Sequence, residues 1–288
     1  MQPSAAAMPI PPPAHESHRG WHAGLDLEFA ASYECTKLVH RAHRGPLMVQ
    51  SPFYPEGPVC HLYVLHPPGG VVAGDSLGVT VRLRERAHAL LTTPAATKIY
   101  RSNGDTACID QDLSLAPGAT LEWLPQDTLA FAGARARIRT RVRLRGSARF
   151  MGWEALCLGL PASGERFDHG SIRQDMELWK DDEPLLIERN ACDAGSALMR
   201  SAWGLANRCA FASMLVYPAE EHLLPAVRAL LERSDAPTAA ATEVDGVLVC
   251  RVIGDDMSRV RKLLVAIWQM LRPKFLGLEP SAPRIWAT

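Results

Sequence analysis

The chain has 288 residues, of which 47% are hydrophobic and 22% are charged, and its 31 basic side chains balance 31 acidic ones. This length and composition suffice for one large globular domain or two ordinary ones. The charge balance gives no overall attraction to nucleic acid or to an anionic membrane surface, so neither is expected as a partner. No apolar run approaches the roughly 20 residues that cross a bilayer, and no signal peptide is visible, which predicts a cytoplasmic protein.

The first part of the chain predicts a tail followed by a β-rich body. Residues 1–20 are rich in proline and lack a periodic apolar pattern, so we expect a disordered N-terminal segment. From Trp21 to about Tyr217, short strand-like runs such as 79–83 and 121–124 alternate with Gly, Pro, Asn and Asp turns. Residues 21–217 are therefore predicted to form an all-β body that starts near Trp21.

After residue 217 the pattern changes to helix and strand. Apolar residues between 223 and 231 follow helical spacing, and two strand-like runs, 240–244 and 247–253, flank the hairpin dipeptide Asp245-Gly246. A second helix is predicted over 260–271, with Asp256 or Ser258 as its N-cap and Pro273 preventing its continuation. Residues 218–288 are thus predicted to be a small, helix-containing α/β portion packed on the body.

One segment alternates with unusual regularity between arginines and small or apolar residues. Because successive strand side chains point to opposite faces, it predicts a half-buried strand with a basic outer face, and repulsion between these charges makes nearby acidic groups expected. Such a face is either a solvated surface that discourages edge pairing or a docking site for an acidic partner. The candidate docking residues are Arg135, Arg137, Arg139, Arg141 and Arg143.

Signatures of common catalytic classes are missing from the sequence. There is no P-loop, and the glycines from Gly69 to Gly74 lead into a strand-like run instead of a helix that could hold phosphate. The segment around Ser163 lacks the glycines of a nucleophile elbow. The seven cysteines are dispersed without a C-x-x-C pair, and the ten histidines form no convincing ligand set, so no tightly bound cofactor is expected. Transient binding of a borderline cation such as Ni(II) stays open.

Several carboxylates lie in apolar surroundings, where an acidic side chain needs a partner. They either cap turns and pair with arginines, or they line a polar cavity or an interface between proteins. We treat both readings as open. The candidates are Asp75, Glu122, Asp127 and Glu154.

The segments that contain these carboxylates resemble, in order, the signature segments of the UreD family of urease accessory proteins. The ending 283–286 also looks like the C-terminus of that family. The resemblance covers the chain from about Trp21 to its end. The matching segments are 67–75, 92–101, 121–127, 132–134 and Trp153-Glu154 followed by Gly159 and Gly164-Glu165.

This resemblance implies a mainly β fold, a β-helical stack of short strands with two α-helices. It also implies a scaffold without catalytic activity that works in urease maturation. Proteins of this family bind UreF, which recruits the GTPase UreG, and the assembly docks on apo-urease so that nickel is inserted into the urease active site. The resemblance implies that the carboxylates at 75, 122, 127 and 154 line an internal passage or an interface.

A second function class fits a β-helical stack as well. In a carbohydrate-active enzyme of this shape, Asp75, Asp127 or Glu154 would supply a general acid and base. Sugar-binding grooves are usually rich in aromatic residues, which make up 7% of this chain. This low share counts against a sugar-binding groove, so the carbohydrate-active enzyme is the alternative and not the main hypothesis.

Overall fold

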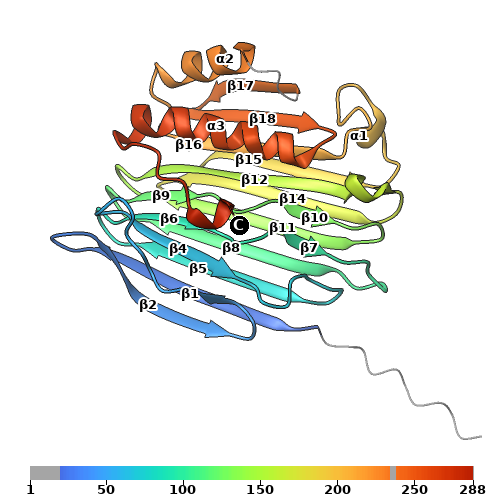
Figure 1. Ribbon diagram of the computed structural model, residues 1–288, viewed down its shortest axis with the longest axis horizontal. Helices are drawn as coiled ribbons and strands as arrows, with labels where there is room; N and C mark the ends of the chain where they lie inside the picture. Colours follow the sequence, from blue (N-terminus) through green and yellow to red (C-terminus); the bar gives the residue numbers. More distant parts are fainter. Residues whose placement is uncertain (1–19, 234–237, 288) are drawn as a thin grey trace, which may run out of the picture.

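The computed structural model describes residues 20–233 and 238–287. In this part of the chain, two large β-sheets face each other, and helices cover the outer face of one of them (Figure 1). The first strand, β1 (His22–Ala31), begins where the sequence predicts the fold to begin. The prediction of a disordered segment over residues 1–20 falls, except for Gly20, outside the described residues.

The first sheet contains seven strands within the described ranges, in the order β15-β14-β11-β8-β5-β1-β2. Its five inner strands run parallel, and β2 and β15 close its edges in antiparallel pairing. The other bounds are β2 (Thr36–Arg44), β5 (Ser76–Leu83), β8 (Ala107–Leu115), β11 (Arg135–Leu144), β14 (Ser171–Lys180) and β15 (Glu183–Asp193).

The second sheet follows the order β17-β18-β16-β12-β9-β6-β4-β3, with β7, β10 and β13 paired beside this path. Strands β4, β6, β9 and β12 are parallel neighbours, whereas β16, β18 and β17 continue the sheet in antiparallel pairing. The bounds are β3 (Met48–Val49), β4 (Cys60–Leu65), β6 (His88–Thr92), β7 (Thr97–Ile99), β9 (Thr120–Trp123), β10 (Thr128–Ala130), β12 (Arg149–Leu160), β13 (Glu165–Arg166), β16 (Ala210–Tyr217), β17 (Thr238–Val244) and β18 (Val247–Gly254).

The chain coils between the sheets, because strands of the first sheet alternate along the sequence with strands of the second. Each turn of the coil places its strand beside the matching strand of the turn before, so Cys108 of β8 lies opposite Ser76 of β5 and Arg137 of β11. This parallel stacking is the β-helical arrangement that the family resemblance implies, and the mainly β fold class is confirmed.

Three α-helices and two short 3₁₀-helices lie within the described residues: α1 (Ala197–Arg200), α2 (Leu223–Arg233), α3 (Met257–Leu276), η1 (Pro161–Ser163) and η2 (Arg284–Ala287). The two predicted C-terminal helices are α2 and α3, whereas α1 was not predicted. Asp256 is the N-cap of α3, since its carboxylate accepts a hydrogen bond from the Ser258 amide.

The prediction that Pro273 ends this helix is wrong, because α3 continues to Leu276. Proline removes only the hydrogen bond that its own amide would donate to the carbonyl of Gln269, and the residues after it can still follow the helical path. Beyond Pro273, Phe275 packs in the core with 2% of its surface exposed, which holds the last turn. Gly277, in the left-handed conformation, closes the helix with a bond from its amide to the Pro273 carbonyl.

The predicted hairpin at Asp245-Gly246 joins β17 to β18, and both turn residues have positive φ as a type I′ turn requires. These two strands extend the sheet that contains β16.

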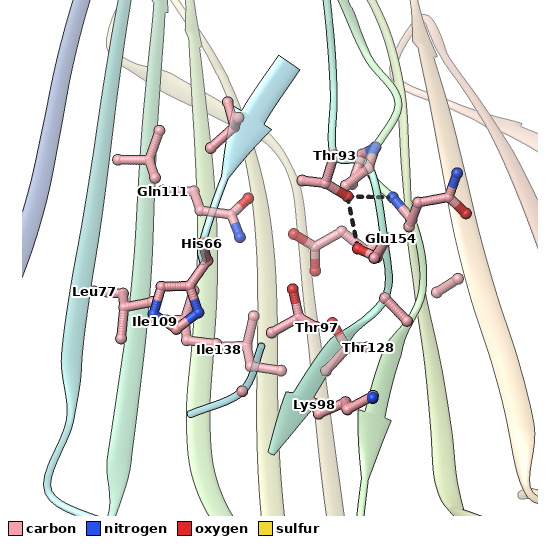
Figure 2. Close-up of a pocket in the computed structure, with 18 of the residues that line it drawn as sticks. His66, Leu77, Thr93, Thr97, Lys98, Ile109, Gln111, Thr128, Ile138 and Glu154 are labelled. Carbon is pink, nitrogen blue, oxygen red and sulfur yellow. Dashed lines mark hydrogen bonds between the residues drawn. The ribbon is translucent and has the colours of Figure 1, made fainter. Parts of the chain in front are cut away.

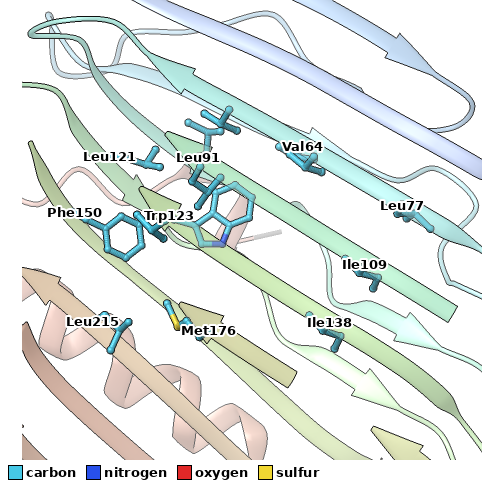
Figure 3. Packing of buried hydrophobic residues seen from close by; sticks show 14 of the residues in the cluster. Val64, Leu77, Leu91, Ile109, Leu121, Trp123, Ile138, Phe150, Met176 and Leu215 are labelled. Carbon is cyan, nitrogen blue, oxygen red and sulfur yellow. The ribbon is translucent and has the colours of Figure 1, made fainter. Parts of the chain in front are cut away.

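Two hydrophobic cores result from this layering. Leu27, Leu91 and Phe150 belong to the core between the two sheets, part of which Figure 3 shows. Trp153 and Trp268 belong to the core between the second sheet and its helices. The central strands of the second sheet, β4, β6, β9, β12 and β16, are consequently buried on both faces, which is typical of strands covered on each side.

Candidate functional site

A cavity of about 210 Å³ lies between the two sheets (Figure 2). Apolar side chains such as Leu77, Ile109 and Ile138 form much of its wall. Its polar lining comes from both sheets and from the segment 93–98 that carries one of the family-like motifs: His66, Thr93, Thr97, Lys98, Gln111, Gln126, Thr128, Glu154 and Gln174. A mostly apolar hollow with a few converging polar groups is the usual form of a binding site.

Glu154 supplies a buried carboxyl group to this cavity. On β12 it alternates with Trp153, so that Trp153 packs toward the helices while Glu154 points between the sheets. Glu154 is buried, with 7% of its surface exposed. The Thr140 hydroxyl donates to Glu154 Oε1, and the Gln174 amide donates to Glu154 Oε2 at 3.0 Å. Both partners belong to the first sheet, so this carboxyl group joins the two sheets across the interior.

Burial raises the pKa of the Glu154 carboxyl group to about 7, despite hydrogen bonds from Thr140 and Gln174 that favour the ionised form. The carboxylate of Glu188 adds to the rise by repulsion. Among the described residues, no basic side chain forms an ion pair with Glu154. Near neutral pH this group is therefore partly protonated, and an arriving cation would favour its ionised form.

This raised pKa predicts how the Glu154→Gln variant responds to pH. A carboxyl group whose pKa rises on folding is destabilising once the unfolded chain ionises, so the penalty is absent below pH 4.5 and complete above pH 7. The free energy of unfolding of the variant should therefore increase relative to that of the parent by about 1.4 kcal/mol per pH unit in that window, roughly 3 kcal/mol in total. Urea unfolding at pH 5, 6, 7 and 8 measures the difference.

Glu232→Gln on the exposed face of α2 is the control for removing one carboxylate. A stability difference between Glu154→Gln and the parent that stays constant across the four pH values would contradict the pKa assignment.

A polar line leads from Glu154 toward the surface. Ser213 lies opposite Glu154 in the β12–β16 ladder, and its hydroxyl donates to Glu188 Oε1 at 2.8 Å. Arg251, opposite Ser213 on β18, donates to the same carboxylate at 3.2 Å, and 49% of its side chain is exposed. Polar side chains thus continue from the position opposite Glu154 in the ladder to the exposed Arg251. No sequence pattern indicates these residues as site residues, although Ser213 and Gln174 are polar side chains inside strand-like runs.

Glu122 lies on the other side of the second sheet. On β9 the neighbouring Trp123 lines the cavity, so Glu122 faces the helices. It is fully buried and accepts hydrogen bonds from His88, Trp268 and Arg272, the last at 3.0 Å. Burial alone would raise the pKa of Glu122, but the bonds and charges of His88 and Arg272 outweigh it and lower this pKa to about 2. Glu122 is therefore a fixed anion in a buried ion network.

Asp75 and Asp127 hold other parts of the fold in place. The Asp75 carboxylate accepts bonds from the backbone amides of Trp21 at 2.8 Å and Val72 at 2.9 Å, so it ties the start of β1 to the glycine-rich turn. Asp127 lies 3.2 Å from Arg261 of α3. The structure thus does not bring the four candidate carboxylates together, and of the four, Glu154 lines the cavity.

The five docking candidates lie on the outer face of the first sheet, while the residues between them are buried. The expected acidic neighbours are present on β8 and β14, which flank β11. Arg135 reaches the Gly104 carbonyl at 3.5 Å. The ion pairs are Arg137 with Asp175 at 4.0 Å, Arg139 with Asp110 at 2.8 Å, Arg141 with Glu177 at 2.6 Å and Arg143 with Asp112 at 3.1 Å.

Three features are absent from the described part of the chain: a cluster of metal ligands, a facing pair among the carboxylates named for the alternative enzyme, and a membrane-spanning helix. Across residues 20–233 and 238–287, no three His, Cys, Asp or Glu side chains gather as a metal site. Of the carboxylates named for the alternative enzyme, Asp75 accepts from two backbone amides, Asp127 pairs with Arg261, and Glu154 lines the inter-sheet cavity, so they do not face one another across a shared groove as the paired carboxylates of glycoside hydrolysis do. In the same residues, no helix has the length and apolar character needed to span a membrane.

Comparison with known proteins identifies close relatives over almost the whole chain. The sequence model described as UreD urease accessory protein matches residues 22–287. A protein named Urease accessory protein UreD from Citrobacter koseri is 45% identical over 275 residues, which cover 94% of this chain and 93% of that protein. Proteins of the same name from Alkalilimnicola ehrlichii and Pseudomonas entomophila are 42% and 45% identical and cover 99% and 98% of this chain, and 96% and 99% of their own lengths.

Proposed function

Because the chain belongs to the UreD family of urease accessory proteins, we propose that it is a non-catalytic scaffold in urease maturation that helps nickel reach the active site of apo-urease. The buried carboxyl group of Glu154 in the inter-sheet cavity, which has no ion-pair partner among the described residues, is the observation that carries the nickel part of this proposal. Nickel is here a cargo, not a resident cofactor. We place the protein in the cytoplasm, where it meets urease before activation.

The proposed partners are UreF, the GTPase UreG recruited through UreF, and the apo-urease subunits. The resemblance of the family-like motifs supports UreF and UreG. The sequence has no P-loop, so any nucleotide hydrolysis that drives maturation must come from a partner such as UreG. Docking of one partner on the arginines of β11 stays a prediction, and it requires the partner to compete with carboxylates that already pair with Arg139, Arg141 and Arg143.

A passage for Ni(II) is supported by the chemistry of the interior. A divalent cation in an apolar core is costly unless oxygen or nitrogen ligands replace its water. Glu154, Gln174 and Gln111 offer such oxygens in the cavity, and Ser213 and Glu188 continue them toward the exposed Arg251. The described residues contain no cluster of three or more His, Cys, Asp or Glu side chains that would hold a metal ion tightly, which is consistent with an ion that binds transiently.

Deleting the gene in a host that produces urease tests the proposed function. We expect the purified urease of the deletion strain to contain little nickel and to be inactive, and a plasmid copy of this chain should restore both. Metal analysis of the urease separates this result from a loss of urease expression. Full nickel content in the deletion strain would refute the proposed role.

A further inference from the structure

Two cysteine side chains lie next to each other on the side of the second sheet that faces the helices. Cys157 lies on β12, and Cys209 directly precedes β16, where Ala210 is opposite Cys157 in the antiparallel ladder. A 2.7 Å bond from the Leu158 amide to the Cys209 carbonyl joins the two segments at this point. The two thiols form a hydrogen bond with each other, and we name them the thiol pair.

The positions of the thiol pair suit a disulfide bond. A disulfide needs two Cα atoms within roughly 7 Å of each other and side chains that point toward each other. Paired Cα atoms of antiparallel strands lie about 5 Å apart, and Cys209 is one position from the partner of Cys157. The hydrogen bond between the thiols shows that the sulfur atoms already meet. Both cysteines are free thiols, so a bond between them requires little movement of the backbone.

The two members of the thiol pair differ in their access to solvent. Cys157 is buried, with 2% of its surface exposed. Cys209 is half-buried and lines a hollow of about 670 Å³ beside the end of β12. Its thiol lies 3.4 Å from the carbonyl oxygen of Asp255, which borders the same hollow. A small solute therefore reaches Cys209 first, and Cys157 is placed to react only with Cys209.

The contact within the thiol pair also divides the chemical roles. The hydrogen bond with Cys157 lowers the pKa of Cys209, although burial and the carboxylates of Asp255 and Asp256 oppose this effect. The same hydrogen bond and burial raise the pKa of Cys157. Because the thiolate is the nucleophile, Cys209 is the member that attacks an oxidant, and Cys157 is the member that then closes the disulfide.

We propose that the thiol pair is a site of reversible oxidation, at which hydrogen peroxide converts Cys209 and Cys157 into a disulfide. The Cys209 thiolate attacks one peroxide oxygen, and the O–O bond breaks. Cys209 becomes a sulfenic acid, and the leaving hydroxide takes a proton to form water. The Cys157 sulfur then attacks the Cys209 sulfur, and the sulfenic hydroxyl group leaves as water with the Cys157 proton. The two sulfur atoms lose two electrons in total, and the peroxide is reduced to two water molecules.

Thiol–disulfide exchange with glutathione returns the disulfide to two thiols. Disulfides in a reducing compartment are usually transient in this way and serve catalysis or redox sensing. The proposal goes beyond the proposed function, and it does not depend on whether nickel moves through the inter-sheet cavity.

Peptide mapping of the full chain tests the proposal. Cleavage after lysine and arginine places each of the seven cysteines on a separate peptide, with Cys157 in residues 150–166 and Cys209 in residues 209–228. The chain is treated with hydrogen peroxide at pH 7, and the remaining thiols are then blocked with iodoacetamide. We expect mass spectrometry to find these two peptides linked, with a mass two hydrogens below their sum. Dithiothreitol added before blocking should abolish the link.

Three variants assign the two roles. Cys157→Ala should leave Cys209 as a sulfenic acid that dimedone traps, whereas Cys209→Ala should leave the buried Cys157 unmodified. Cys108→Ala is the matched control, because Cys108 is a half-buried cysteine on β8 in the other sheet. This control should give as much linked peptide as the parent chain.

Three results would overturn the proposal. The first is that peroxide yields no linked peptide from the parent chain, a result that needs no variant to fold. The second is a link between Cys209 and a cysteine other than Cys157. The third is an equal yield of the linked peptide from chain unfolded in urea, which would show that the fold does not direct the pairing. Since the readout is a peptide mass, none of these results bears on the nickel content of urease.

Discussion

Replacing Arg272 with methionine is expected to lower the free energy of unfolding at pH 7 by about 3–5 kcal/mol. Arg272 is fully buried on α3, where its guanidinium group bonds to Glu122 at 3.0 Å and to Glu56 at 2.7 Å. Methionine fills the volume but leaves both carboxylates without their main counterion. His61 and His88, which also contact these carboxylates, cannot replace a permanent charge. Urea unfolding measures the loss.

Two further variants show whether the missing charge causes this loss. Lys274→Met removes a cation from the same helix at an exposed position and should change the stability by less than about 1 kcal/mol. Adding Glu122→Gln to Arg272→Met should restore part of the stability, since one uncompensated charge is then absent. If Arg272→Met and Lys274→Met are equally stable, the buried network does not hold α3 on the second sheet.

The network is also where sequence-based prediction reaches its limit. Glu122 and Arg272 are 150 positions apart in the chain, and no local pattern relates them. The alternating arginines, by contrast, predict both the strand β11 and its outward face, because a period of two residues is a local property and one face of the first sheet is exposed. Where polar and apolar residues alternate along a strand with one exposed face, both the strand and its exposed face can be predicted from the sequence.

The orientation of the carboxylates could not be predicted, for a related physical reason. The segments Glu122-Trp123 and Trp153-Glu154 look alike, yet Glu122 faces the helices and Glu154 faces the cavity. Because both faces of the second sheet are buried, hydrophobicity does not alternate along β9 and β12, and the sequence contains no sign of which residue points inward. The sequence motifs therefore identify the segments that contain the carboxylates. The register of each strand in the β-helical stack decides which of these carboxylates faces the cavity.

Glu154→Gln should lower the nickel content and the activity of urease together, by about tenfold, in a host that carries the other maturation proteins. Glutamine keeps the size and an amide oxygen but cannot release a proton when a cation arrives, whereas the pKa of Glu154 near 7 lets it do so. In the parent, nickel loading should therefore rise with pH between 6 and 8, and in the variant this rise should be absent. Nickel loading is followed by metal analysis of the purified urease.

The stability of this variant, measured beside its nickel loading, separates a loss of loading from unfolding. The same substitution is expected to stabilise the chain above pH 7, because it removes a carboxyl group that is costly to bury. A more stable chain that loads less nickel would indicate that the carboxyl group is retained for function at the expense of stability. Normal nickel content with Glu154→Gln would exclude this carboxyl group from the route, while Glu232→Gln on α2 controls for the change in charge.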